Sequence, residues 1–512
     1  MYGLFHAQGL QPLGLALSVI AAVTATTWAA GMEPTGEVAV VRLPVPQDPT
    51  ISFRLWFGVG SQNDPPGKEG LASLTASMLA DAATQRNGYE QILDRLYPLA
   101  AGYDASVSEE MTVIAGRVHR DNLEAYYPLL IDAVLAPAFQ QQDLDRLKSQ
   151  ALNYLENTLR YASDEDLGKA VLQSRVFAGT RYAHLPVGLI DSVRNIRLED
   201  VRSFYREHYR RGNVVIGIGG GFEEGLVKRL QSDLARLPEG RPPQPHPPQP
   251  APIRGLQVTI VEKDAPATAI SIGYPISILR GPREWYALAV ANSYLGEHRN
   301  SSSHLYQVLR EARGLNYGDY SYIEHFPQGS QLQMPPQNVA RRRQMFEIWI
   351  RPVPHEARHF ALRAALREFK KLVDEGMREA DFELTRRFLA KYVLHYAPTT
   401  MERLGYALDD RFYGVQGSHL ENFRRWMPDL TLEEVNAAIR KHWQYDNLQV
   451  VIVTHDAESL RKALVSDAPS PYQYPTPKPP AILEEDRHIA VFPLNIRPEN
   501  VTIVPVAELF LK

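Results

Sequence analysis

Residues 58–84 read GVGSQNDPPGKEGLASLTASMLADAAT and combine the end of a strand, a polar turn and a helix. The turn at residues 63–67 is dense in residues that break regular structure. Four apolar residues recur at helical spacing and predict one buried helix face: Leu71, Leu74, Met78 and Leu79. Because positions three and four apart stack on a helix, a second face carries only small groups: Ser73, Ala76 and Ser77.

This stretch resembles the first-half signature of the insulinase/pitrilysin-like zinc peptidases, the inverzincins. In that family the same helix carries His-x-x-Glu-His, the inverted zincin motif. The two His positions fall on Ser73 and Ser77 here, and the Glu position falls on Ala76. The flanking residues match the family well: Gly58, Gly60, Ser61, Asn63, Asp64, Gly67, Gly70, Leu71 and Ala72.

The metal-binding side chains of the family motif are absent from this chain. Zinc takes imidazole, thiolate or carboxylate ligands, which two serines and an alanine do not supply. The resemblance places a further Glu ligand at residues 150–154, but no carboxylate occurs there and Glu156 is the nearest. The sequence therefore predicts that this chain binds no zinc and that residues 73–77 belong to a plain core helix.

Length and composition set wide bounds on the class of protein. The chain has 512 residues and 44% hydrophobic content, enough for two or more domains with cores. Its 55 basic and 59 acidic residues give a net charge of -4, which indicates neither a nucleic-acid surface nor a polybasic membrane patch. The absence of cysteine excludes disulfides and thiol chemistry and is compatible with the periplasm.

The N-terminus predicts export. Residues 13–30 form an apolar run with small-residue cleavage points, which favours a signal peptide within residues 1–30. No Lys or Arg precedes Arg42, so the usual positive region is missing, and an uncleaved membrane anchor is the alternative. We expect a periplasmic chain, or one anchored in the membrane and facing the periplasm.

A helix-to-strand unit occurs twice in the chain. Residues 198–201 match residues 432–435, and the same offset of 234 pairs His208 with His442 and Asn213 with Asn447. Two tandem halves are also what the family resemblance implies. We predict an α+β fold of two homologous halves, each a mainly antiparallel sheet packed with helices, together forming a clamp.

The expected organisation has five segments. A stretch rich in proline, PEGRPPQPHPPQPAPIR, favours an extended linker between the two halves. The segments are a signal or anchor at 1–30, an N-terminal half at 31–237, the linker at 238–254, a C-terminal half at 255–468 and an extension at 469–512.

A second motif lies in residues 305–317, LYQVLREARGLNY. Apolar spacing predicts a helix that Gly314 ends, after which Tyr317 begins a strand. This resembles the second-half signature of the same family, with Arg310 and Tyr317 at the matching positions. The resemblance implies that the guanidinium and the phenol hold the substrate backbone and a developing oxyanion. A surface Arg beside a half-buried Tyr is the alternative interpretation.

Residues 355–359 spell His-Glu-x-x-His, the ordinary zincin pattern. Pro352 and Pro354 place His355 and His359 in the first helical turns, near solvent. No further His follows until His395. We therefore favour a simple helix start in which the helix dipole stabilises a Glu.

Some members of the family divide the catalytic parts between two polypeptides, one with His-x-x-Glu-His and one with the Arg/Tyr pair. This chain has only the second part, so we expect a zinc-free subunit that pairs with a zinc-bearing homologous subunit and binds substrate peptide. Two alternatives stay open. One is a non-catalytic peptide-binding or scaffold protein of the cell envelope, and the other is an autonomous zinc protease that uses His355 and His359.

Overall fold

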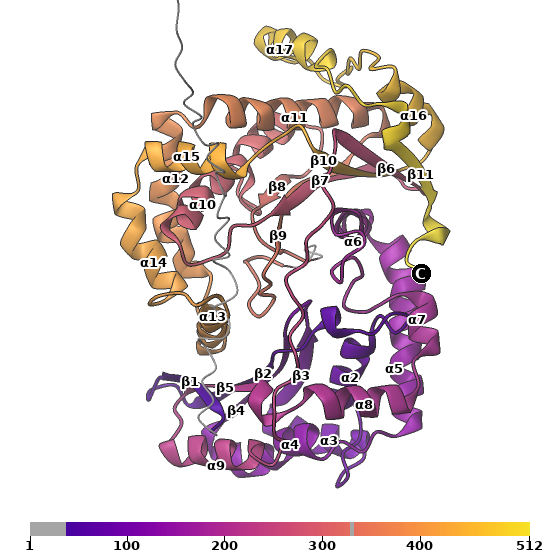
Figure 1. The fold of residues 1–512 in the computed structure, drawn as a ribbon. Helices are drawn as coiled ribbons and strands as arrows, with labels where there is room; N and C mark the ends of the chain where they lie inside the picture. The colour runs from indigo at the N-terminus through magenta and orange to yellow at the C-terminus, as the bar shows by residue number, and fades with distance from the viewer. Residues whose placement is uncertain (1–36, 328–331) are drawn as a thin grey trace, which may run out of the picture.

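The structure, a computed structural model, describes residues 37–327 and 332–512 (Figure 1). The predicted signal peptide or anchor at residues 1–30 lies outside these residues. Within the described ranges, no helix combines the length and the apolar character needed to cross a membrane.

The first half contains a five-stranded sheet of order β1-β5-β2-β4-β3. Only β1 and β5 run parallel, and the other neighbours are antiparallel. The strands are β1 (Ala39–Pro44), β2 (Thr50–Phe57), β3 (Gly102–Val107), β4 (Thr112–His119) and β5 (Val214–Gly220).

The second half repeats this topology with one strand added, in the order β11-β6-β10-β7-β9-β8. Strands β6 and β10 are the parallel pair that corresponds to β1 and β5. The bounds are β6 (Leu256–Glu262), β7 (Thr268–Ile276), β8 (Asp319–Tyr322), β9 (Gln344–Val353), β10 (Leu448–Thr454) and β11 (Val501–Pro505). The prediction of two homologous, mainly antiparallel halves is confirmed.

The repeat predicted from sequence keeps its register in space. Helix α8 (Leu198–His208) precedes β5, and helix α15 (Leu432–His442) precedes β10, with every boundary offset by 234 residues. A capping box starts α15, because Thr431 Oγ1 accepts from the amide of Glu434 at 3.2 Å and the Glu434 carboxylate accepts from the amide of Thr431.

Helices cover both sheets. Those of the first half are α2 (Leu71–Ala80), α3 (Tyr89–Leu96), α4 (Leu123–Leu135), α5 (Gln141–Asn153), α6 (Asp164–Val176), α7 (Ile190–Asn195) and α9 (Glu224–Leu234). Those of the second half are α10 (Arg283–Gly296), α11 (Arg358–Glu375), α12 (Glu379–Tyr392), α13 (Thr400–Tyr413), α14 (His419–Trp426), α16 (Ala457–Val465) and α17 (Pro480–Ala490). Two π-helical segments, η4 (Tyr154–Ala162) and η6 (Tyr306–Glu311), complete the list.

Each half lends a helix to the sheet of the other half. Helix α6 packs on β7 and β10, while α13 packs on β1, β2 and β5, beside which it lies in Figure 1. On α13, the ring of Phe412 meets that of Trp56 of β2 edge-on, with centroids 6.1 Å apart. The cavity of the candidate site is lined by residues of both halves.

The segments outside the two halves also pack on the body. In the linker, the carbonyls of Pro245 and Pro248 accept bonds from Arg342 and Arg343. In the C-terminal extension, β11 pairs in parallel with β6. The chain then returns to the first half, where the carbonyl of Phe510 accepts from the amide of Ile190 at 2.8 Å.

Candidate functional site

The helix that corresponds to the family's zinc helix is held firmly at its N-terminus. The carboxylate of Asp64 accepts from the amides of Gly70 at 2.8 Å and Ala72 at 2.7 Å, and lies 3.2 Å from Nε2 of His184. These bonds satisfy amides that begin α2 and place negative charge at the positive end of the helix. Burial raises the pKa of Asp64, against the opposing effect of His184 and the two amides.

The positions where the family has metal ligands carry none here. Ser73 and Ser77 are partly buried, and Ala76 is buried. Glu156, the nearest carboxylate to the expected third ligand position, forms an ion pair with Arg194. Within the described residues, no group of three His, Cys, Asp or Glu side chains is placed to hold a metal. The side chains at this position therefore do not fit zinc.

A cavity of about 350 Å³ opens beside this helix, between the two halves. The first half lines it with Ser73, Ser108, Tyr154, Lys169 and Gln173, among others. The second half contributes His325, Phe326, Met345 and Glu347. The degenerate zinc helix thus still faces the space that the two sheets enclose.

An ammonium group is buried in the wall of this cavity. Lys169 donates to the carbonyl of Phe326 at 2.6 Å, and its Nζ lies 3.7 Å from Oε2 of Glu347. It also lies 4.4 Å from the ring centroid of Tyr322 and 4.6 Å from that of Trp349, in cation–π geometry. Burial lowers the pKa of Lys169 and raises that of Glu347. Oε1 of Glu347 has no hydrogen-bond partner among the described residues, so the cavity wall offers an unused acceptor.

Next to this pair, Glu109 connects the two halves. Its Oε1 accepts from Arg341 at 3.0 Å and from Gln173 at 2.8 Å. Burial lowers the pKa of the adjacent His325 to about 3, so this ring is neutral at pH 7 and Arg341 supplies the fixed charge. Although burial opposes it, His325, Arg341 and the hydrogen bonds to the carboxylate lower the pKa of Glu109 to about 2.

The structure brings Arg310 and Tyr317 together at the surface. The guanidinium carbon of Arg310 lies 5.9 Å from the ring centroid of Tyr317 and 4.7 Å from that of Tyr306. Tyr317 is 76% exposed. Arg310 lies in the π-helical segment η6, a geometry often found at functional sites. Neither residue lines the cavity beside Ser73, and Arg310 is half-buried.

In the His-Glu-x-x-His sequence, His355 contacts protein groups and His359 is buried. Nδ1 of His355 lies 2.8 Å from Oγ1 of Thr268, and Nε2 lies 2.9 Å from the carbonyl of Ala265. His359 is buried, and burial lowers its pKa to about 4. Because Thr268 and the carbonyl of Ala265 lie within hydrogen-bond distance of the two ring nitrogens of His355, this histidine has no free nitrogen for a metal in this conformation.

An open strand edge borders the cavity. Strand β3 pairs with β4 on one side and forms the end of the first sheet. Its side chains alternate between exposed and half-buried. Val107, at its end, and Ser108 both line the cavity. An edge of this kind presents unpaired backbone groups to an incoming extended segment.

Comparison with known proteins agrees with this architecture. Residues 39–183 match the family model described as insulinase (peptidase family M16), and residues 195–389 match the one described as peptidase M16 inactive domain. The two matches together span most of the chain, so the chain belongs to this insulinase-like family.

Individual relatives are distant. A non-peptidase homolog of Helicobacter pylori, YmxG, is 22% identical over 417 residues, which cover 79% of this chain and 88% of that protein. An uncharacterized zinc protease of Streptomyces coelicolor is 24% identical over 300 residues, 57% of this chain, and the match spans only 63% of that protein's length. The crystal structure of a peptidase M16 inactive domain from Pseudomonas fluorescens superposes with a TM-score of 0.72 at 24% identity, covering 82% of this chain and 96% of that one.

Proposed function

We propose that this chain is a zinc-free subunit that pairs with a zinc-bearing homologous subunit to form a heteromeric metallopeptidase. The observation that carries the proposal is the contrast within α2. Asp64 anchors this helix beside the cavity, while Ser73, Ala76 and Ser77 supply no metal ligand. In this proposal zinc belongs to the partner, and this chain alone does not cleave peptides.

The Arg/Tyr pair is the part that this chain contributes to the joint site. Arg310 and Tyr317 lie against each other, and the exposed ring of Tyr317 is available to a partner. A fixed guanidinium and a phenol are suitable donors to a peptide carbonyl and to the negative charge that grows on it during hydrolysis. Their exposure within one chain supports a role across a subunit interface.

Substrate peptide has a suitable docking place in this chain. An extended segment can add to the free edge of β3 through backbone hydrogen bonds. Its side chains would then point toward the cavity, where Glu347 keeps an unused acceptor and Lys169 a buried ammonium. Such binding depends on the backbone of the peptide more than on its side chains, so it would accept a broad range of peptide sequences.

Reconstitution with a zinc-bearing homologue tests the proposal. Mixed subunits should cleave a peptide that neither cleaves alone, and Arg310→Ala or Tyr317→Phe should lower kcat about 100-fold without preventing assembly. Arg387→Ala and Tyr97→Phe are matched controls, because both side chains are exposed elsewhere on the surface. Unchanged activity in the first two variants would reject the assigned role.

A non-catalytic peptide-binding or scaffold protein of the cell envelope is the second candidate, supported by the likeness to a non-peptidase homolog. A stable monomer that binds unfolded peptides, with no gain of activity on mixing, would favour it. An autonomous protease that uses His355 and His359 is the third, and would require a metal on a ring whose nitrogens are bonded here. For the location, we propose the periplasm or a membrane anchor facing it, as the apolar run at residues 13–30 suggests.

A further inference from the structure

A second, smaller cavity of about 60 Å³ lies inside the C-terminal half, away from α2. Its wall is formed by α10, by the segment around β8 and by residues of α12 to α14. Six aromatic rings line it: Trp285, Tyr322, Phe326, Tyr396, Tyr406 and Phe423. A water needs about 10–15 Å³, so the cavity has room for a group of a few heavy atoms.

The carboxylate of Glu297 lies in this wall without a cation. Glu297 follows the last residue of α10 and is 8% exposed. Within residues 37–327 and 332–512 it forms no ion pair, and its polar neighbours are the hydroxyl groups of Ser293, Tyr322 and Tyr396. A buried carboxylate without a partner is costly, and the negative end of the helix dipole adds to that cost. Burial accordingly raises the pKa of Glu297 to about 7.

The cavity wall contains a second hydrogen-bond acceptor without a partner. Oδ1 of Asn292, also on the cavity wall, has no hydrogen-bond partner in the described parts of the chain. The ring nitrogens of His298 and His419 carry no charge at pH 7, because burial lowers the pKa of His298 to about 4 and that of His419 well below its usual value. The wall therefore offers a carboxylate, an amide oxygen and aromatic faces, and among the described residues it also has two donors without hydrogen-bond partners, Nε1 of Trp285 and Nη1 of Arg280.

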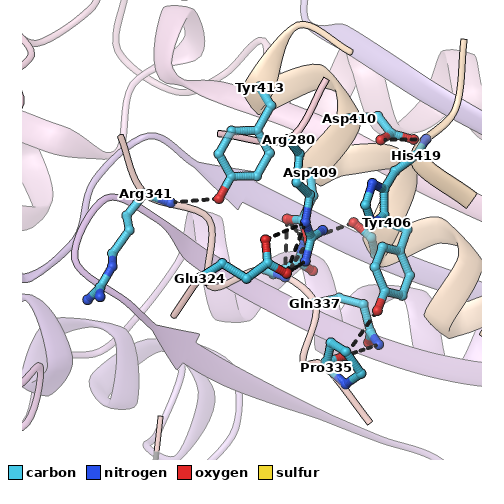
Figure 2. Close-up of polar contacts among 12 residues, drawn as sticks. Arg280, Glu324, Pro335, Gln337, Arg341, Tyr406, Asp409, Asp410, Tyr413 and His419 are labelled. Carbon is cyan, nitrogen blue, oxygen red and sulfur yellow. Dashed lines mark hydrogen bonds and ion pairs between the residues drawn. The ribbon is translucent and has the colours of Figure 1, made fainter. Parts of the chain in front are cut away.

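The cations near the cavity are already neutralised. Figure 2 shows Arg280 between Glu324 and Asp409, with Tyr406 and His419 close by. Nε of Arg280 donates to Glu324 at 2.8 Å, and Nη1 lies 3.6 Å from Asp409. Lys169, whose ammonium lies 4.4 Å from the ring centroid of Tyr322, is matched by Glu347. That contact also shows that one of these rings accommodates an ammonium group.

We propose that this cavity binds an alkylammonium group, which Glu297 neutralises and the aromatic rings surround. The negative faces of aromatic rings attract a cation, and the attraction is stronger when the site excludes water. Glu297 and Asn292 Oδ1 would accept its N–H donors. The group is the end of a lysine side chain or a small free amine, since both present the same chemistry. This site is separate from the Arg310–Tyr317 pair, so it stands or falls independently of the subunit pairing.

Titration of the full chain with methylammonium chloride, against sodium chloride at equal ionic strength, tests the proposal. Trp285 lines the cavity, so we expect a saturable change in tryptophan fluorescence with methylammonium chloride and none with sodium chloride. Glu297→Gln keeps the shape of the side chain and should weaken binding at least about tenfold. Glu375→Gln, on an exposed side chain at the end of α11, should bind like the wild type.

A further arm identifies the source of the group. Tighter binding of N-acetyl-lysinamide than of methylammonium would assign the site to a lysine side chain, and the reverse order would assign it to a free amine. No saturable response to either compound, or equal affinity of the wild type and Glu297→Gln with both shown to be folded by thermal unfolding, would overturn the proposal.

Discussion

Arg341 of the second half donates to Glu109 of the first half at 3.0 Å, and neither side chain is exposed. The next residues repeat the pattern, because Arg342 forms an ion pair with Glu110. A buried charge whose partner is removed stays uncompensated, which makes such a contact sensitive to substitution. These two pairs join the halves beside the cavity that Ser73 lines.

Replacing Arg341 by Met should lower the free energy of unfolding by about 3–5 kcal/mol, because Glu109 would stay buried without its cation. Urea unfolding measures this change. Arg341→Met combined with Glu109→Gln should recover part of the loss, whereas Arg497→Met, at an exposed ion pair, should have little effect. A loss below about 1 kcal/mol for Arg341→Met would contradict the importance of this pair.

The same carboxylate predicts a pH dependence of stability. The pKa of Glu109 is lowered from 4.5 to about 2 in the folded chain, so between these values the unfolded chain binds more protons. The contribution of Glu109 is complete above pH 4.5 and is lost as the pH falls toward 2. Unfolding free energies measured across this window should fall less steeply in Glu109→Gln than in the wild type, and parallel curves would be evidence against the prediction.

Gly60, in the turn before α2, allows this turn to contact the segment that contains Ser108 and Glu109. A Cβ at this position would lie 2.3 Å from the carbonyl oxygen of Ser108 and 2.5 Å from that of Glu109. Gly60→Ala should therefore destabilise the fold by about 1–3 kcal/mol, measured by thermal or urea unfolding. Gly225→Ala is the control, since nothing lies within 4 Å of its added Cβ, and equal stability of the two variants would refute the argument.

The C-terminal extension braces the segment that carries the Arg/Tyr pair. Arg313, three residues after Arg310, is buried and donates to Asp486 and Glu485, each at 2.8 Å. Arg313→Leu should release α17 and make residues 469–512 sensitive to limited proteolysis. Arg487→Leu, on an exposed side chain of the same helix, should leave the digestion pattern unchanged. Full protection of the extension in Arg313→Leu would contradict this bracing.

Much of the fold could be predicted because its signals are local or repeated. The offset that pairs Asn213 with Asn447 predicts the matching ends of both halves. The sequence does not predict helix α17, because it follows a proline-rich stretch that is typical of an extended segment. The helix predicted to end at Gly314 is largely the π-helical segment η6, since hydrophobic spacing does not distinguish these helix types.

The candidate site was only partly predictable. The loss of ligands at Ser73 and Ser77 is visible in the sequence, and so is the approach of Arg310 to Tyr317. The buried Lys169–Glu347 pair is not, because it depends on α6 packing against the sheet of the other half. The carboxylate of Glu297 gave no sequence signal, since its isolation follows from the shape of the surrounding rings.

The central claim is that zinc and cleavage belong to a partner and not to this chain. The most direct test is the zinc content of the purified chain, measured after dialysis against buffer with trace zinc, together with its cleavage of an unfolded peptide. The account predicts far less than one zinc per chain and no cleavage until a zinc-bearing homologue is added. One zinc retained per chain, with cleavage by the chain alone, would contradict it.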